Sequence, residues 1–311
     1  MMSTIRRQIR NSALNSPAMW RTLPLLLAIL FAVLSFPAPL AHAADGEAPD
    51  PLEKPRGMWF PPNDFYPRYI ADPLRPQNAL TLLWLADTEI FDTSDKRFGL
   101  RLGGSFSIYR WHPADDTERG WQLNFEGGFA GQFDIDYSWD NTGWDGFYGL
   151  VLNWRLNPEL AFRAGSQHDS SHVGDEYMER TGHARVKYTR EEGILGVAWS
   201  FRPRWDFYGE LGYGNGISGS VTARVETGLQ YISPQRYWKG RASWFTALDI
   251  RTYEETDWST RFTAQIGYLI PMGERSMQYR FAVEFGTGRS VMGQFHWYDE
   301  TWLGVGWYVD F

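Results

Sequence analysis

The chain has 311 residues, with 30 Lys and Arg, 37 Asp and Glu, and no cysteine. The lack of cysteine excludes disulfides, cysteine-ligated zinc, iron–sulfur clusters and thiol nucleophiles, and the net charge of −7 argues against nucleic acid as a partner. Aromatic residues make up 17% of the chain, although its mean hydropathy is slightly polar at −0.42. An ordinary globular protein draws its apolar residues more from Leu, Ile and Val.

Residues 1–43 have the pattern of a bacterial secretory signal peptide. Four arginines precede an apolar run over residues 23–36, and the small residues Ala41 and Ala43 follow it. A basic region, a short apolar core and a small-residue cut site define such a signal. The apolar run is also shorter than the ~20 residues that a membrane-spanning helix needs. We therefore expect export and cleavage after Ala43.

Residues 44–78 are rich in proline. Proline donates no backbone hydrogen bond and is excluded from sheet interiors. This segment is expected to be an N-terminal tail, a periplasmic strap or a plug segment.

From residue 79 to residue 311 the sequence alternates between apolar and polar residues. In 221–231 and again in 277–285, one face is apolar or aromatic and the other carries charges, Gln and Gly. A period of two is typical of β-strands with two different faces. The segment 79–311 is therefore expected to be all-β.

Three features favour an outer-membrane β-barrel over a soluble sandwich. Aromatic residues fall near the ends of the segments, as membrane-interface girdles require. Glycines and charges share the polar face, which suits a narrow polar lumen. The last segment ends in Phe311, with Val309 and Trp307 on the same face, and this ending resembles the signal that the barrel assembly machinery of bacteria reads. The expected fold is a transmembrane antiparallel β-barrel in the bacterial outer membrane, with a Pro-rich N-terminal periplasmic segment.

The pattern predicts twelve strands, an even number as bacterial barrels require. Residues 183–201 are taken as one long strand with a bulge, because a turn within them would make the number odd. A twelve-stranded barrel is only slightly wider than an eight-stranded one that side chains fill, so we expect a narrow or plugged lumen. The predicted strands are 79–87, 97–110, 119–133, 146–155, 160–171, 183–201, 205–214, 220–231, 240–251, 258–270, 277–288 and 299–311.

The predicted strand 160–171 departs from the pattern at its outer end. One face begins with Leu160 and Phe162, as a lipid face should, but it ends with His168 and Ser170. Polar residues facing lipid are costly and usually serve a function. The two side chains are close enough to hydrogen-bond, so that His168 could act as a general base toward the Ser170 hydroxyl.

The His168-x-Ser170 pattern resembles the motif of outer-membrane phospholipase A and of the outer-membrane lipid A 3-O-deacylase. That resemblance implies a lipid-facing His–Ser pair whose His is oriented by an Asn or Glu on the next strand. This sequence departs from both families, because Ser171 follows the serine and Gly182 stands where the third member is placed.

Three carboxylates remain as candidates for the orienting acid, and reach alone does not choose between them. These are Asp175, Glu176 and Glu191.

A wider resemblance covers nearly the whole of the expected mature chain, from residue 44 onward. Residues 59–61, 71–76, 168–177 and 188–191 are similar to a bacterial family known only as a domain of unknown function. The resemblance implies an exported outer-membrane protein and no particular reaction.

Two other interpretations of the His–Ser stretch stay open. Residues 168–176 are also typical of a solvated outer loop. Alternatively, His172, Asp175 and Glu176, together with His168, are residue types that bind zinc or another divalent ion, and carboxylates with loop carbonyls suit calcium. Calcium would also stabilise an oxyanion in a hydrolase.

The sequence thus supports three functions from different classes. The first is an acyl-ester hydrolase of phospholipid or lipid A that uses Ser170 as the nucleophile and His168 as the base. The second is a narrow channel, and the third is a non-enzymatic barrel that binds lipid or a partner. The substrate and the oligomeric state are not encoded in any of these patterns.

Overall fold

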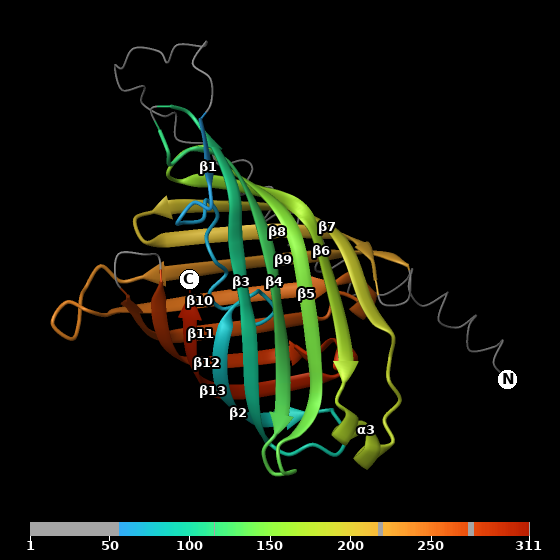
Figure 1. The fold of residues 1–311 in the computed structure, drawn as a ribbon. Helices are drawn as coiled ribbons and strands as arrows, with labels where there is room; N and C mark the ends of the chain where they lie inside the picture. Colours follow the sequence, from blue (N-terminus) through green and yellow to red (C-terminus); the bar gives the residue numbers. More distant parts are fainter. Residues whose placement is uncertain (1–55, 115, 217–219, 273–276, 311) are drawn as a thin grey trace. The chain divides into compact units, whose positions relative to one another are not determined.

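The computed structural model describes residues 56–310 except for residues 115, 217–219 and 273–276. Within them, twelve antiparallel strands form one closed barrel and a thirteenth short strand joins its edge (Figure 1). The predicted signal peptide over residues 1–43, residues 44–55 and Phe311 lie outside the described residues.

The strands are β1 (Arg56–Trp59), β2 (Asn78–Thr88), β3 (Lys96–His112), β4 (Gly120–Asp134), β5 (Asp140–Arg155), β6 (Leu160–Val173), β7 (Tyr188–Arg202), β8 (Trp205–Asn215), β9 (Val221–Ile232), β10 (Ser243–Tyr253), β11 (Thr260–Pro271), β12 (Gln278–Arg289) and β13 (Asp299–Asp310). The short helices are α3 (Asp175–Thr181), η1 (Glu254–Thr256) and η2 (Gly293–Phe295). Among the described residues, no helix is long and apolar enough to cross a membrane.

Each strand from β2 to β13 pairs with the next strand along the chain, and β13 pairs with β2 to close the barrel. In the closing pair Val305 lies opposite Leu82. The twelve predicted strands correspond one to one with β2–β13, which confirms the predicted fold class. Chain entry at Asn78 and exit at Asp310 lie at the same end, and the end with α3 and η2 carries the longer loops. Since longer loops are extracellular in such barrels, we call the α3 end the outer end.

Two predicted boundaries are wrong at the outer end. The strand predicted from residue 183 begins at Tyr188, because the residues before it form α3 and an extended connection. The strand predicted from residue 146 begins at Asp140, because a tight turn follows β4. In that turn Ser138 and Trp139 adopt positive φ angles of 58° and 68°, and the Trp139 amide donates to the Asp134 carbonyl at 2.9 Å.

The two faces of the sheet differ as a membrane barrel requires. Outward side chains are apolar and exposed, such as Leu195 at 64% and Ile266 at 57%, whereas inward charged residues such as Arg224 and Glu226 are only 1% exposed. Aromatic rings pack against one another around the inner end, where Trp121 stacks on the neighbouring strand's Trp154 at 5.1 Å between ring centroids. An apolar band with an aromatic girdle and a polar interior is typical of outer-membrane barrels.

β1 covers a part of β3 that β2 does not reach. β2 pairs with β3 only over residues 96–101, whereas β1 pairs with residues 109–112. Trp59 packs edge-on against Tyr109 with 4.7 Å between ring centroids. The N-terminal segment therefore pairs an otherwise open edge, and open sheet edges are not tolerated in lipid.

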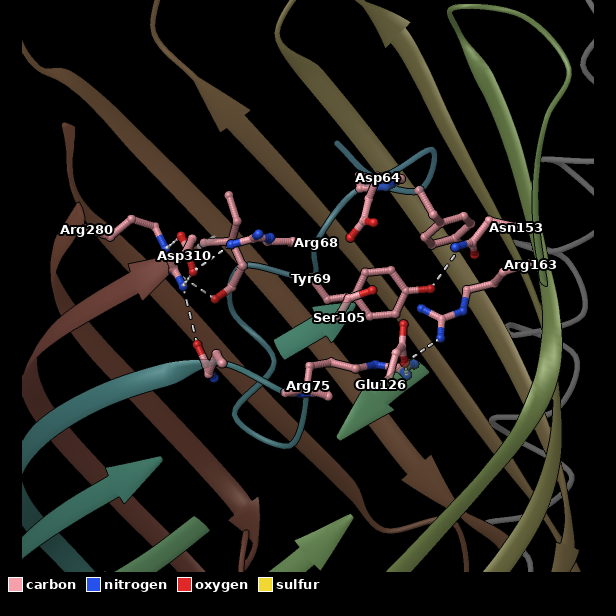
Figure 2. Close-up of a pocket in the computed structure, with 15 residues that line it drawn as sticks. Asp64, Arg68, Tyr69, Arg75, Ser105, Glu126, Asn153, Arg163, Arg280 and Asp310 are labelled. Atoms are coloured by element: carbon pink, nitrogen blue, oxygen red, sulfur yellow. Dashed lines mark hydrogen bonds and ion pairs between the residues drawn. The ribbon is translucent and has the colours of Figure 1, made fainter. Parts of the chain in front are cut away.

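The segment between β1 and β2 lies inside the lumen, as Figure 2 shows for Tyr69 and Arg75. The Tyr69 ring stacks on the Tyr208 ring of the barrel wall, 3.7 Å between centroids and 5° from parallel. The Arg75 guanidinium binds Glu210 directly and Glu226 at 3.2 Å. We call residues 60–77 the plug segment.

Loops pack against one another at the outer end. Tyr177 of α3 packs against Phe295 of η2, 5.5 Å between centroids, in a buried cluster that includes Met292. In the same loop, the buried His296 places Nδ1 2.7 Å from the Gly293 carbonyl oxygen. Burial lowers the pKa of His296 to about 4.

We expect the loop over residues 290–298 to open in acid. Because the folded loop holds His296 neutral down to about pH 4 and an unfolded His titrates near 6.5, the folded form binds fewer protons between these values. The stability that neutral His296 contributes to the folded loop is therefore fully present above about pH 6.5 and falls as the pH drops toward 4. Hydrogen exchange of this loop, corrected for intrinsic rates, should speed up between pH 7 and pH 4.5. The pH dependence should disappear in His296→Asn, and its persistence there would contradict the assignment.

Candidate functional site

His168 and Ser170 lie on the outward face of β6, as the alternation predicted. Strand register places His168 between Tyr148 of β5 and Glu191 of β7. One step further toward the outer end, Ser170 lies between Gly146 and Thr189 in the same two strands. The two residues thus occupy neighbouring rows of a lipid-facing surface.

The His168 ring is held from both sides. Its Nδ1 is in hydrogen-bond contact with Oε1 of Glu191, and its face stacks on the Tyr148 ring at 4.5 Å and 21°. The His168 side chain is 18% exposed and that of Glu191 is 56% exposed. With Nδ1 engaged by a carboxylate, Nε2 is the ring nitrogen left for proton transfer.

Ser170 does not contact His168 in this arrangement. Its Oγ donates to the Gly146 carbonyl oxygen at 3.3 Å, and no hydrogen bond joins it to His168 in the described part of the chain. Same-face neighbours on a strand are about 7 Å apart along the backbone, so rotation of the two side chains has to close the remaining gap. Catalytic hydrogen bonds are often long before substrate binds.

Gly146 keeps the surface beside Ser170 open. A Cβ at this glycine would lie 3.5 Å from Ser170 Oγ. Larger side chains at this position would therefore fill the space from which a substrate approaches the hydroxyl.

Asp175 and Glu176 lie in the first turn of α3, beyond the end of β6. Both are exposed, and the hydrogen bonds of the described residues do not link either of them to His168. Glu191 is the one of the three candidate acids that contacts the imidazole. The place of Glu191 opposite His168 depends on the register between β6 and β7, and the places of Tyr148 and Gly146 depend on the register between β5 and β6. The sequence pattern reveals neither register.

His172 stacks on the Trp144 ring at 4.2 Å and 15°. Among the described residues, one group of three or more His or carboxylate side chains brings its ligand atoms within 4.8 Å of one another. This group consists of Asp72, Glu226 and Asp249. His172, Asp175 and Glu176 are not part of such a group.

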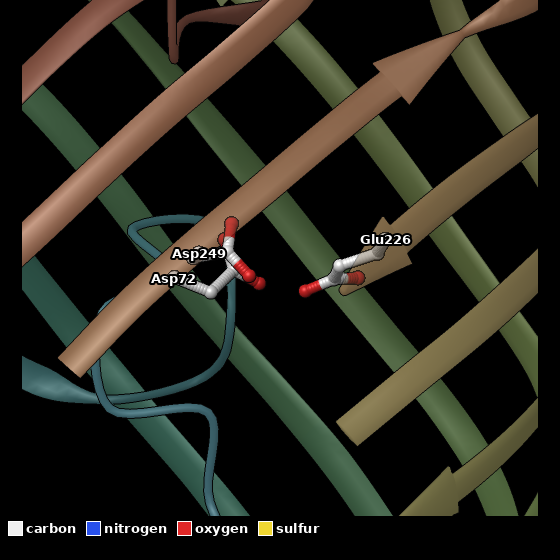
Figure 3. A group of neighbouring side chains, drawn as sticks. All are labelled: Asp72, Glu226 and Asp249. Atoms are coloured by element: carbon white, nitrogen blue, oxygen red, sulfur yellow. The ribbon is translucent and has the colours of Figure 1, made fainter. Parts of the chain in front are cut away.

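The three carboxylates of that group converge in the lumen, where Asp72 belongs to the plug segment (Figure 3). Arg251 binds both Asp72 and Glu226, and the Tyr208 hydroxyl donates to Asp249 at 2.8 Å. Because arginines and a phenol already surround these oxygens, the group is explained by charge pairing between plug and wall.

Glu191 is expected to position His168 for proton transfer. Glu191→Gln keeps the size of the side chain but removes the charge that stabilises an imidazolium. In a hydrolase built on this site, kcat on a lipid ester should therefore fall roughly 10²–10⁴-fold with KM nearly unchanged. The matched controls are Asp175→Asn and Glu176→Gln, which should leave both constants unchanged. A fall in kcat for these controls, or none for Glu191→Gln, would reassign the orienting acid.

Solved structures share the fold. The outer membrane phospholipase (OMPLA) dimer of Salmonella typhi with bound calcium matches with a TM-score of 0.52 and 11% identity, over 79% of this chain and 94% of that one. An active-site mutant of Escherichia coli outer membrane phospholipase A matches with a TM-score of 0.51 and 13% identity, over 76% and 92%.

At these identities the likeness establishes an outer-membrane β-barrel fold and nothing about activity. No curated protein sequence matches the chain. The model of one family, described as protein of unknown function (DUF1207), matches residues 52–311, and the chain therefore belongs to the DUF1207 family.

Proposed function

We propose that this protein is an outer-membrane acyl-ester hydrolase of phospholipid or lipid A. The observation that carries the proposal is the contact between His168 and Glu191 on a lipid-facing surface, with Ser170 in the next row of the same strand. A nucleophile, a base and an acid that orients the base are the parts of a serine hydrolase.

In the proposed reaction, the Ser170 hydroxyl transfers its proton to Nε2 of His168 and Oγ attacks the ester carbonyl carbon. The resulting imidazolium is stabilised by the Glu191 carboxylate and returns the proton to the departing alcohol. Water, activated by the same imidazole, then releases the fatty acid and restores Ser170. The site needs no cavity, because the substrate is already dissolved in the membrane that surrounds the barrel.

A covalent probe tests the nucleophile directly. An alkyl sulfonyl fluoride in mixed micelles should add one sulfonyl group to the wild-type protein, and peptide mass spectrometry should locate it at Ser170. Ser170→Ala should stay unlabelled, whereas His168→Ala should label much more slowly. Labelling elsewhere, or none at all, would reject Ser170 as the nucleophile.

We propose further that residues 1–43 direct export and are removed. The basic, apolar and small-residue regions of this segment support cleavage after Ala43. N-terminal sequencing of protein purified from the outer membrane should begin at Ala44. A sequence that begins at Met1 would refute cleavage.

The competing channel function is less well supported. The plug segment packs on the barrel wall through Tyr69 and Arg75, and ion pairs occupy the lumen around it. We therefore expect the wild-type barrel to conduct poorly.

A further inference from the structure

We propose that the surface immediately outward of Ser170 binds the phosphate of the lipid whose ester is attacked. This inference rests on the proposed hydrolase function and adds the place where the phosphate of that lipid binds. It is carried by two exposed cations, Arg185 and Lys187, at the outer end of the row that contains His168 and Ser170.

The outward face of β6 is an ordered series. His168, Ser170 and His172 follow one another along it, each about 7 Å further toward the outer end, and β6 ends at Val173. His172 lies flat against Trp144. The row thus has a polar edge at its outer end.

Arg185 and Lys187 belong to the connection from α3 to β7. Arg185 and Lys187 flank Val186, whose amide and carbonyl hydrogen-bond the Gln294 side chain at 2.8 and 2.7 Å, and Gln294 Nε2 also donates to the Ser171 carbonyl at 2.7 Å. Lys187 directly precedes Tyr188, whose register partner is Ser171, the residue after Ser170. Both cations therefore lie close to the outer end of the Ser170 row.

These two cations differ from the other arginines nearby. Arg180 binds Asp92 and Asp140 at 2.9 and 3.1 Å, and Arg190 binds Glu192 at 3.0 Å inside the lumen. Arg185 and Lys187 are exposed, and in the described part of the chain neither has a carboxylate or hydrogen-bond partner. Their charges are free to meet an anion from the membrane.

The chemistry of bacterial lipids fits this spacing. In a glycerophospholipid only glycerol carbons separate the phosphate from the acyl esters, and in lipid A a sugar ring separates them. A lipid with its ester carbonyl at Ser170 and its chains along the apolar wall would hold its phosphate above His172. Arg and Lys bind phosphate through charge-assisted hydrogen bonds.

Binding can be measured without hydrolysis in the Ser170→Ala variant. Two phosphate-bearing probes, dihexanoyl phosphatidic acid and diphosphoryl lipid A, are titrated into the protein in neutral detergent micelles, with dihexanoylglycerol as the uncharged probe. Adding Arg185→Gln and Lys187→Gln should weaken binding about fivefold for each cation removed. The affinity for dihexanoylglycerol should not change.

The matched control removes the same charge from the inner end. Arg204 and Lys239 are exposed residues of inner-end turns, and Arg204→Gln with Lys239→Gln should leave the affinity for both phosphate probes unaltered. A larger loss for one probe than for the other identifies glycerophospholipid or lipid A as the source of the phosphate. Equal affinity with and without Arg185 and Lys187, or no phosphate-dependent binding, would overturn the proposal. Because the measured quantity is binding, this test is independent of the hydrolase test. If the wild-type protein hydrolyses no lipid ester but the loss of Arg185 and Lys187 still weakens phosphate binding, the hydrolase proposal fails and the phosphate site stands.

Discussion

Ser170→Ala should abolish lipid-ester hydrolysis, lowering kcat by on the order of 10⁴-fold or more. The Ser170 hydroxyl lies on the same strand as His168, in the row beside the His168–Glu191 contact toward the outer end, and alanine removes it without disturbing the strand. The measurement is fatty-acid release from mixed micelles of phospholipid, and separately of lipid A, by purified protein.

Ser166→Ala is the matched control for this prediction. Ser166 lies on the same face of β6, one row from His168 in the opposite direction, and faces Gly193 in β7 where Ser170 faces Thr189. The two substitutions therefore remove the same hydroxyl from equivalent positions on either side of the base. Ser166→Ala should keep wild-type kcat, and equal activity of Ser170→Ala and wild type would sink the hydrolase proposal. Heat-dependent gel migration of each variant reports whether the barrel has folded.

The barrel was predictable from sequence because each strand is encoded locally. Alternation with a period of two marks which residues face lipid and which face the lumen, so that the strand with Leu160 and Phe162 could be assigned before any partner strand was known. His168 and Ser170 stood out for the same reason, as polar residues on a face that began apolar.

What was not predictable depends on contacts between distant segments. Glu191 meets His168 only because β6 and β7 pair in one particular register, and α3 lies between those strands. The prediction of a strand that starts at residue 183 does not say which of its residues lies opposite His168. The register between β5 and β6 likewise decides that Tyr148 stacks on His168, and alternation does not predict which residues are neighbours across the sheet.

The plug segment shows the same limit. Its prolines exclude it from the sheet, but they do not say whether it lies outside or inside the barrel. Its place is set by charges from far along the chain, since Arg75 binds Glu210 and Arg251 binds Asp72. In the local sequence of its own strand or loop, each of these residues looks like any other polar residue.

Arg75→Ala should loosen the plug segment and open the lumen. The Arg75 guanidinium binds Glu210 and Glu226 and lies 4.6 Å above the Tyr69 ring. Removing one partner of a buried ion pair leaves a charge uncompensated and costs about 3–5 kcal/mol. We expect the wild-type barrel to be nearly silent in planar lipid bilayers and the Arg75→Ala barrel to show frequent conducting events.

Arg68→Ala supplies the control within the same segment. Arg68 pairs with Asp310 at 3.3 Å, but its side chain is 36% exposed, and ion pairs in contact with water contribute at most about 1 kcal/mol. Loss of this pair should therefore leave the lumen closed, although the number of side-chain atoms removed is the same. If Arg75→Ala were as silent as Arg68→Ala, the plug would be held by its aromatic and backbone contacts, such as the Tyr69–Tyr208 stack, and not by the buried charges. If the wild type already conducted like an open pore, the plug segment would not close the lumen in a membrane.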